Sequence, residues 1–290
     1  MSREDNPVGL SRERERLLRR ISTRKGREKE GVVLVEGPRV LGVALDAGAP
    51  FSFILVQDEA LGSEAKALLA RFAHELPPDV PVVRIPARDF RTLSDTETPQ
   101  GIAAVVREPR TGLPSSPDSD AGGILILDRI QDPGNAGTLI RAAAAFGLER
   151  VVALDGTVDV WNPKVVRASA GLAFRVPLHQ AGWDEAESWL DRIGATFLVA
   201  DAGGTDLRAW TAARPPLSRW ALAVGNEARG PRQEVLARAA AVLSIPLAPG
   251  VESLNAAMAG TVLLWALGPG RIPAPSHPSA SPPSSPESGP

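Results

Sequence analysis

Cysteine is absent from this chain of 290 residues, and histidine occurs only three times. Without cysteine there is no disulfide, no thiolate metal ligand, no iron-sulfur cluster and no cysteine nucleophile. His74, His179 and His277 lie far apart in the sequence, whereas a zinc site built from histidines has its ligands at short, regular spacings. We therefore expect a protein that works without a metal.

Long apolar runs are also missing. The longest, around residues 256–267, falls short of the stretch of about 20 residues that crosses a bilayer as a helix. The opening MSREDNPVGLSRERER has no apolar stretch after its charges, unlike a secretion signal. These features predict a cytoplasmic protein with no membrane partner.

An overall positive charge is missing too, because the formal net charge is −2. Residues 1–30 nevertheless contain ten Arg or Lys and six Asp or Glu, a net charge of +4, which leaves −6 for the other 260 residues. All but four of the 32 basic residues are arginine, whose planar fork of donors suits phosphate. Residues 1–30 are thus either a basic arm that binds nucleic acid or a solvated helix with acidic partners such as Glu13 and Glu15.

Composition divides the rest of the chain. Residues 31–106 contain short β-type runs and a helical apolar spacing, which predict a small α/β domain. Residues 107–123 collect Pro, Ser, Gly and Asp, as linkers do. Residues 124–267 alternate uniformly apolar strands with helices, which indicates a parallel sheet covered on both faces. Residues 268–290, rich in Pro and Ser, are expected to be a disordered tail because they cannot bury a core.

The first informative segment is LDRIQDPGNAGTLIRAAAAFG, residues 127–147. A strand is expected to end at Asp128, and the turn after it leads into a helix with Asn135 at the N-cap. Arg141 is the only charge on that helix and has apolar neighbours. Because an unpaired buried arginine is costly, it either pairs with Asp128 or Asp132, or faces a cleft where it meets a phosphate or ribose. For Asn135 taken alone, helix capping is the simpler interpretation.

The second segment is ALAVGNEARGP, residues 221–231. An apolar strand ends at Gly225, where the missing side chain leaves room for a cofactor to approach the backbone. Glu227 in the following loop is, by itself, more typical of a solvated acid. Gly230 is followed by Pro231, so the loop is not a Walker A motif, and the chain has no GxGxxG dinucleotide motif.

The third segment is IPLAPGVESLNAAMAGTVLLWAL, residues 245–267. A strand is expected to end at Ile245, and Ser253 and Asn255 mark the start of a helix that is apolar all round and is therefore predicted to be buried. Two polar residues at the mouth of a buried helix either cap it or bind a ligand, and capping is again the simpler interpretation.

Together and in this order, the three segments resemble the motifs of the SpoU (TrmH-like) branch of the SPOUT methyltransferases. These enzymes transfer a methyl group from S-adenosylmethionine to a ribose 2′-hydroxyl of RNA. The matching residues are DPGNAG with Arg141, then GNEARG, then IPLAPGVESLN, and NPKVVRASAG at residues 162–171 is also similar. STRKGREKEGVVLVEGPRVL, residues 22–41, is similar to the RNA-substrate-binding domain, related to a ribosomal-protein fold, that precedes the catalytic domain in many members.

The resemblance implies an α/β fold with two domains. A SPOUT catalytic domain with a parallel sheet and a C-terminal trefoil knot would occupy residues 124–267, after a small α/β RNA-substrate-binding domain at residues 31–106. S-adenosylmethionine is the implied methyl donor, with no metal, and RNA is the implied partner. A homodimer through the catalytic domain is implied as well.

The resemblance also implies roles for individual residues. Those implied in catalysis are Arg141, Asn135, Glu227, Ser253 and Asn255. Those implied in cofactor binding are Gly225, Ile245, Leu254 and Asn255. Those implied in RNA binding are Arg24, Lys25, Arg27, Arg39, Arg141 and Arg167.

Methyl transfer requires that the 2′-oxygen be aligned with the methyl group and lose its proton. A guanidinium holds its proton too tightly to be a good base, so we expect Arg141 to bind the phosphate beside the target ribose, helped by Asn135. Ser253 and Asn255 are expected to order the cofactor loop. Glu227 is expected to accept the proton or to hold Arg141.

Three other functions stay open at this point. The substrate is expected to be ribosomal RNA, because the N-terminal domain resembles that of rRNA-modifying members, but a tRNA 2′-O-methyltransferase shares the same motifs. A catalytically silent RNA-binding protein on this fold is disfavoured by the five intact catalytic positions. An enzyme for a base or a small molecule is disfavoured by the arginine-rich segment and the separate N-terminal domain.

Overall fold

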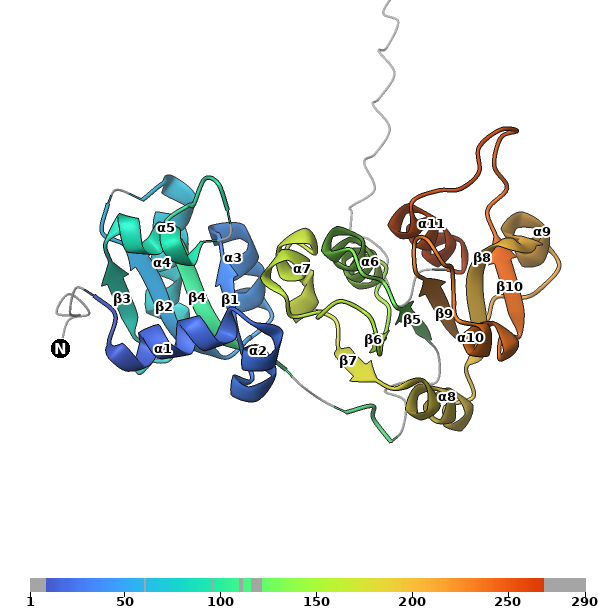
Figure 1. Ribbon diagram of the computed structural model, residues 1–290, viewed down its shortest axis with the longest axis horizontal. Helices are drawn as coiled ribbons and strands as arrows, with labels where there is room; N and C mark the ends of the chain where they lie inside the picture. The colour runs from blue at the N-terminus through green and yellow to red at the C-terminus, as the bar shows by residue number, and fades with distance from the viewer. Residues whose placement is uncertain (1–8, 60, 95, 110–111, 116–121, 269–290) are drawn as a thin grey trace, which may run out of the picture.

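The chain forms two α/β domains that lie side by side, each built on its own sheet (Figure 1). The expected tail lies outside the described residues apart from Gly268, and so do the first eight residues and parts of the expected linker. The computed structural model describes residues 9–59, 61–94, 96–109, 112–115 and 122–268.

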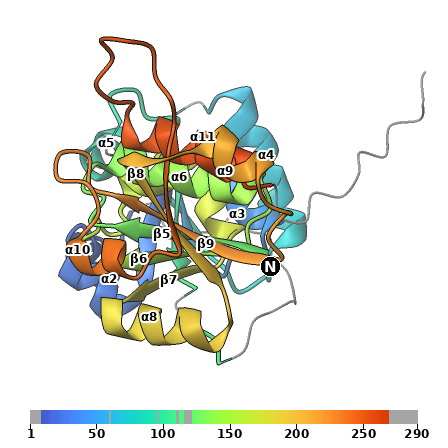
Figure 2. The same cartoon turned by 90° about the vertical axis from the view of Figure 1, so that its right-hand side faces the viewer.

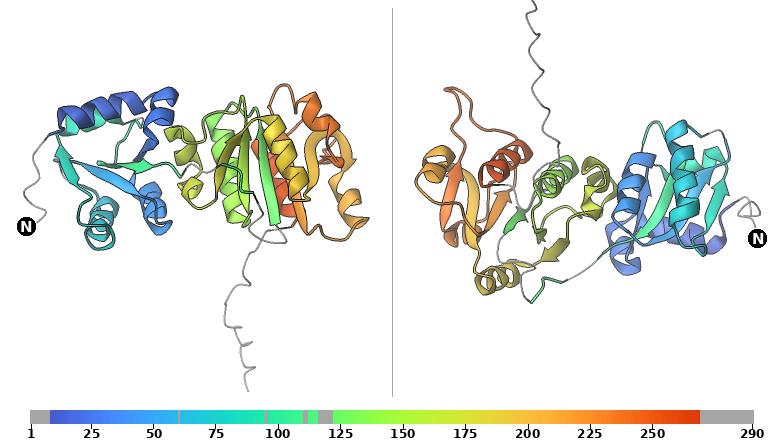
Figure 3. Two further views of the ribbon diagram at one scale, coloured as in Figure 1. Left: turned by 90° about the horizontal axis from the view of Figure 1, so that it is seen from below. Right: turned by 180° about the vertical axis from the view of Figure 1, so that it is seen from behind.

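The N-terminal domain has a four-stranded mixed sheet. Its elements are α1 (Arg12–Ile21), α2 (Arg24–Glu30), β1 (Val32–Glu36), α3 (Pro38–Asp46), β2 (Phe51–Gln57), α4 (Ser63–Glu75), β3 (Val82–Ile85), α5 (Ala87–Leu93) and β4 (Ile102–Arg107). The strand order is β1-β4-β2-β3, in which β2 and β3 are parallel and the other neighbours are antiparallel. Alternate strand residues face opposite sides, so that Val32 packs with α1 and α5 while Val33 packs with α3 and α4. The left view of Figure 3 shows the sheet between these two groups of helices.

Part of the expected basic arm belongs to this domain. Residues 12–30 form α1 and α2, and Leu18 and Ile21 of α1 are buried in the core under the sheet. The helix begins at Ser11, whose side chain accepts a hydrogen bond from the Arg14 main-chain N. The structure shows that α1 has one apolar face in the core and one charged face in solvent. Binding of nucleic acid by this segment stays a prediction.

The second domain has a six-stranded sheet. Its elements are β5 (Gly122–Asp128), α6 (Pro133–Ala145), β6 (Arg150–Leu154), α7 (Pro163–Ala168), the 3₁₀ turn η2 (Leu172–Phe174), β7 (Leu178–Ala181), α8 (Trp183–Arg192), β8 (Thr196–Asp206), α9 (Leu207–Ala212), β9 (Arg219–Gly225), α10 (Gln233–Ala237), β10 (Ala241–Ser244) and α11 (Ala256–Ala266). The order is β10-β8-β9-β5-β6-β7, and all neighbours are parallel. The predicted parallel sheet is therefore confirmed.

Helices cover both faces of this sheet, as its uniformly apolar strands predict. Leu125 and Leu127 pack with α6 and α11 on one face, whereas Ile124 and Ile126 pack with α8 and Val235 of α10 on the other. Figure 2 shows the sheet between α8 on one side and α6 and α11 on the other.

Helix α11 is not buried on all sides, contrary to the sequence prediction. One face packs closely on α6, because a Cβ atom at Gly260 would lie 2.5 Å from Leu139 Cδ2. The opposite face carries Met258, Val262 and Trp265, which are 59%, 44% and 61% exposed. An apolar composition shows that burying the helix surface is favourable, but it does not show whether residues of the same chain bury all of it.

The two domains meet through a tight interface between α2, α3 and β1 on one side and α7, η2 and the loop before α7 on the other. Gly171 has a φ of +82°, and a Cβ there would lie 2.9 Å from the Val40 carbonyl oxygen. At the same domain interface, Arg27 donates from Nε and Nη2 to Asp159 Oδ2 at 2.9 and 2.6 Å, with the two side chains 4% and 5% exposed. The interface therefore combines close backbone packing with a buried ion pair.

Within the described ranges no helix is long and apolar enough to span a membrane. The same residues contain no group of three or more His, Cys, Asp or Glu side chains placed to hold a metal ion. The trefoil knot implied by the resemblance stays a prediction.

Candidate active site

The turn between β5 and α6 presents the Asn135 side chain without using it as a cap. Asp132 is the N-cap, and its Oδ1 accepts a hydrogen bond from the Asn135 main-chain N at 2.8 Å. The sequence prediction of Asn135 as the cap is wrong by one turn, because Asp caps equally well and Pro133 fits the first helical position. The Asn135 side-chain amide is therefore available to other parts of the chain.

Asn135 joins the three motifs through this one side chain. Its Nδ2 donates to Glu227 Oε1 at 2.8 Å, and its Oδ1 accepts from Asn255 Nδ2 at 2.9 Å. Asn255 also caps α11, because its Oδ1 accepts from the main-chain N of Ala257 and of Met258 at 2.9 and 3.2 Å. The fold thus brings together three of the predicted catalytic residues.

The loop that carries Glu227 is fixed at both ends. Near its start, Asn226 Nδ2 donates to the Arg129 carbonyl oxygen at 3.0 Å and to Glu227 Oε2 at 3.4 Å. Near its end, the Arg232 main-chain N and Nε both donate at 2.7 Å to Asp128, which is fully buried. Because a buried carboxylate is costly without a partner, this pair ties the loop to the end of β5.

Gly225 is required by the packing of the loop itself. A Cβ there would lie 2.3 Å from Pro231 N and 2.6 Å from the Gly230 carbonyl carbon. On the side where a Cβ of Gly225 would project, the space predicted for a cofactor is thus filled by Gly230 and Pro231. Gly225 nevertheless lines the cavity next to this loop.

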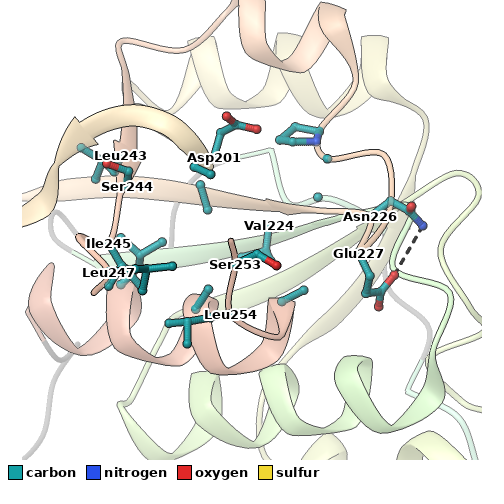
Figure 4. Close-up of a pocket in the computed structure, with 18 residues that line it drawn as sticks. Asp201, Val224, Asn226, Glu227, Leu243, Ser244, Ile245, Leu247, Ser253 and Leu254 are labelled. Atoms are coloured by element: carbon teal, nitrogen blue, oxygen red, sulfur yellow. Dashed lines mark hydrogen bonds between the residues drawn. The ribbon is translucent and has the colours of Figure 1, made fainter. Parts of the chain in front are cut away.

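A cavity of about 200 Å³ opens at the carboxyl ends of β9 and β10 and beside the point where β8 stops pairing with β9 (Figure 4). It adjoins the Asn135 network, because Glu227 belongs to that network and also lines the cavity. Of the predicted cofactor-binding residues, Gly225, Ile245 and Leu254 line it, whereas Asn255 takes part in the network. Ser253, predicted to act in catalysis, lines the cavity as well. The polar side chains of the lining are Asp201, Asn226, Glu227, Ser244 and Ser253, and its larger apolar ones are Val224, Leu243, Ile245, Leu247, Leu254 and Leu263.

Asp201 lines this cavity and was missed in the sequence analysis. It directly follows Ala200, the last residue of β8 that pairs with β9. In parallel α/β sheets ligands bind beyond the carboxyl ends of the strands. A carboxylate directly after the apolar run TFLVA was therefore the signal available in the sequence.

Arg141 lies outside the Asn135 network. Its side chain is exposed on α6, and within the described part of the chain it has no ion pair. The two acids considered as partners are engaged elsewhere, Asp128 with Arg232 and Asp132 as the helix cap. The six residues from Asn135 to Arg141 advance about 9 Å along the helix and about 240° around it, so the two side chains leave α6 in different directions.

Three predicted RNA-binding residues lie exposed on the N-terminal domain. Arg24 Nε donates to Glu28 Oε1 at 2.8 Å, and Arg39 Nη2 donates to Glu64 Oε1 at 3.0 Å. The hydrogen bond and the charge of Glu64 raise the pKa of Arg39, and the same contact lowers the pKa of Glu64. Lys25 has no ion pair among the residues that the structure describes.

Two further predicted RNA-binding residues lie at the domain boundary. Arg27 is buried and bound to Asp159, so its assignment to RNA is wrong. The ion pair joins residues 132 positions apart, which the sequence alone does not reveal. Arg167 on α7 is half-buried and lines a small cavity with Glu36 and Val40 of the N-terminal domain.

Comparison with known proteins places this site in a family. Residues 123–265 match the model of the SpoU rRNA Methylase family, and residues 13–104 match that of the MRM3-like substrate binding domain. The 23S rRNA (guanosine(2553)-2′-O)-methyltransferase RlmP of Bacillus subtilis is 32% identical over 249 residues, which cover 86% of this chain and 93% of that protein. The chain belongs to the SpoU rRNA methylase family. The resemblance of its three motifs is thereby confirmed.

Other proteins match over most of their length. The mouse rRNA methyltransferase 3, mitochondrial, is 31% identical and aligns with 84% of this chain and 69% of its own. The structure of the SpoU methyltransferase AviRb from Streptomyces viridochromogenes in complex with the cofactor AdoMet has a TM-score of 0.77 at 26% identity, covering 89% of this chain and 97% of that one. A TrmH-family structure from Porphyromonas gingivalis has a TM-score of 0.74 at 32% identity, covering 90% and 99%.

Proposed function

We propose that this SpoU protein transfers a methyl group from S-adenosylmethionine to a ribose 2′-hydroxyl of ribosomal RNA. The observation that carries the proposal is the network of Asn255, Asn135 and Glu227 at the edge of the cavity. Its three residues come from the three motifs that the family shares. Relatives named as rRNA methyltransferases support the substrate, and the AdoMet complex of AviRb supports the methyl donor.

The cavity has the chemistry that S-adenosylmethionine requires. Leu243, Ile245 and Leu247 offer apolar walls for an adenine ring, and Asp201 and Glu227 add negative charge that suits a cationic ligand. When bound, S-adenosylmethionine supplies an electrophilic methyl group on a positively charged sulfur. The donor set of the cavity therefore fits this cofactor.

In this proposal Glu227 accepts the proton that the 2′-hydroxyl loses. Asn135 holds its Oε1 and Asn226 its Oε2, so the carboxylate is oriented before the substrate arrives. The residue is exposed, so RNA can reach it, and it also lines the cavity that holds the methyl donor. A carboxylate accepts a proton far more readily than the guanidinium of Arg141.

In this proposal Arg141 binds the RNA phosphate beside the target ribose. It is exposed, and it has no ion pair in the described residues that would compete with an RNA phosphate. The guanidinium presents parallel donors that match two phosphate oxygens. Ser253 and Asn255 order the loop before α11, the first as part of the cavity wall and the second as the helix cap.

A homodimer through the catalytic domain is part of the proposal. Met258, Val262 and Trp265 are spaced so that they share one face of α11 and form an exposed apolar stripe. The Trp265 ring lies 5.6 Å from that of Phe146, which follows α6, so the apolar surface continues toward that helix. Exposed apolar patches of this kind mark protein interfaces, and a second copy of this chain is the proposed occupant. The cytoplasmic location stays a prediction.

Methyl transfer from labelled S-adenosylmethionine tests the proposed function. The protein is incubated with total RNA from cells that lack it, and ribosomal and transfer RNA are separated before counting. We expect label in ribosomal RNA. Label confined to transfer RNA would overturn the substrate, and unlabelled RNA together with normal S-adenosylmethionine binding would overturn the enzymatic role.

A further inference from the structure

Asp201 is the second carboxylate of the cavity, and its two oxygens are not equivalent. Oδ1 accepts a hydrogen bond from the Gly203 main-chain N at 2.9 Å, which fixes the side chain against the part of β8 that no longer pairs with β9. Oδ2 accepts no hydrogen bond from the described residues. The carboxylate is thus held in place with acceptor sites still open.

The open oxygen lies next to the backbone of Gly230, with no side chain between them. A Cβ built on Gly230 would lie 3.4 Å from Asp201 Oδ2, and Gly230 has a φ of +66°, which disfavours any other residue there. Because no side chain projects from Gly230, nothing at that position covers the carboxylate. Asp201 can therefore meet a ligand that enters between β8 and the loop after β9.

Asp201 and Glu227 serve different ends of the cavity. Figure 4 shows them on different sides, with Ile245 and Leu247 farther along the apolar wall. Glu227 is already bound by Asn135 and Asn226 and belongs to the network assigned to the reacting 2′-hydroxyl. The methyl group must lie at that end, and the adenine fits the apolar wall, which leaves the ribose of the cofactor near Asp201.

We propose that Asp201 binds the two ribose hydroxyls of S-adenosylmethionine and so selects a ribonucleoside cofactor. A carboxylate only accepts hydrogen bonds, and a vicinal diol offers two donors at matching spacing. The same pairing of an acidic side chain with ribose hydroxyls recurs at the strand ends of other nucleotide-binding α/β sheets. The inference rests on S-adenosylmethionine binding in this cavity, which the test measures separately.

The test is a set of equilibrium binding titrations of the full chain with S-adenosylmethionine, S-adenosylhomocysteine, and the 2′-deoxy and 3′-deoxy forms of the latter. We expect Asp201→Ala to weaken both ribose-containing ligands by the same factor, on the order of 10- to 100-fold, as for loss of a hydrogen bond to a charged group. Each deoxy ligand keeps one of the two hydroxyls, so it should bind the unchanged protein more weakly than S-adenosylhomocysteine and lose a smaller factor of affinity in the variant. Asp201→Asn keeps an acceptor for the Gly203 N–H and should fall between the two proteins.

Asp206→Ala is the matched control. Asp206 is the last residue of β8, and like Asp201 its side chain accepts a hydrogen bond from a main-chain N–H, that of Arg208, at 2.8 Å. Unlike Asp201, it does not line the cavity. Asp206→Ala should leave all four affinities unchanged. If Asp201→Ala weakens the binding of S-adenosylmethionine but not that of S-adenosylhomocysteine, the proposal is overturned. Asp201 would then contact the positively charged sulfur, which S-adenosylhomocysteine lacks. Equal losses for ribose and deoxyribose ligands would also overturn the proposal, since Asp201 would then act only through its hydrogen bond with the Gly203 N–H. Failure of the unchanged protein to bind either natural ligand would instead remove the proposed cofactor.

Discussion

Asn135 Nδ2 lies 2.8 Å from Glu227 Oε1 and donates a hydrogen bond to it. This contact joins the turn after β5 to the loop after β9, and Asn255 extends it to the start of α11 through the other atom of the same amide. One side chain therefore fixes the relative positions of three loops, and with them the carboxylate assigned to the proton of the RNA hydroxyl.

Asn135→Ala removes both hydrogen bonds of this amide. We expect the single-turnover rate of methyl transfer to fall by about a hundredfold, as when an oriented donor is lost from an active site. S-adenosylmethionine affinity should fall by a much smaller factor, because Asn135 does not itself line the cavity. A rate equal to that of the unchanged protein would remove Asn135 from the mechanism.

Glu227→Gln keeps the size of the side chain and an acceptor for Asn135 but removes the base. We expect the rate of methyl transfer to fall by about a hundredfold or more. Single-turnover rates of both proteins at saturating S-adenosylmethionine check this. Similar rates would exclude Glu227 as the proton acceptor.

Arg141→Lys keeps the charge but loses the fork that binds two phosphate oxygens at once. We expect kcat/KM for RNA to fall by about tenfold or more, as for one lost bidentate contact, while S-adenosylmethionine affinity is unaffected. Steady-state kinetics with RNA as the varied substrate measure the effect. Full activity of the Arg141→Lys variant across neutral pH would exclude both the bidentate contact and any role of Arg141 as a base.

Arg27→Met leaves the Asp159 carboxylate buried without its partner. We expect the free energy of unfolding to fall by about 3–5 kcal/mol, the usual cost of breaking a buried ion pair from one side. Adding Asp159→Asn should recover part of this loss, because the buried charge is then gone as well. Urea denaturation of the unchanged protein, the two single variants and the double variant gives the free energies of unfolding for a double-mutant cycle. If the loss in the double variant equals the sum of the two single losses, the two residues do not interact.

Trp265→Glu places a charge in the apolar stripe of α11. If the stripe is the interface between two copies, the unchanged protein has twice the chain mass of 30.5 kDa and the variant has that mass itself. Light scattering after gel filtration gives both masses. An unchanged protein that is monomeric at all concentrations would contradict the proposed dimer.

The strands and the nearness of the motifs could be predicted because they depend on short-range patterns. Runs such as ILILD are apolar on both faces, which only a covered parallel sheet explains, and polar residues after such strands meet at one edge. Features that depend on distant partners could not be predicted. Arg27 looked like a phosphate ligand until the fold placed Asp159 against it. Asp132 and Asn135 are both good caps, and only the backbone of the turn decides between them.

The central claim is that this chain methylates a ribose hydroxyl of ribosomal RNA at the Asn135 and Glu227 site. Mass spectrometry of nucleosides from ribosomal RNA treated with the protein and S-adenosylmethionine tests it most directly. We predict one new 2′-O-methylated nucleoside, at one position of the RNA, which is lost when the protein carries Glu227→Gln. A methyl group found on a base, or a product that forms equally well with the Glu227→Gln variant, would contradict the account.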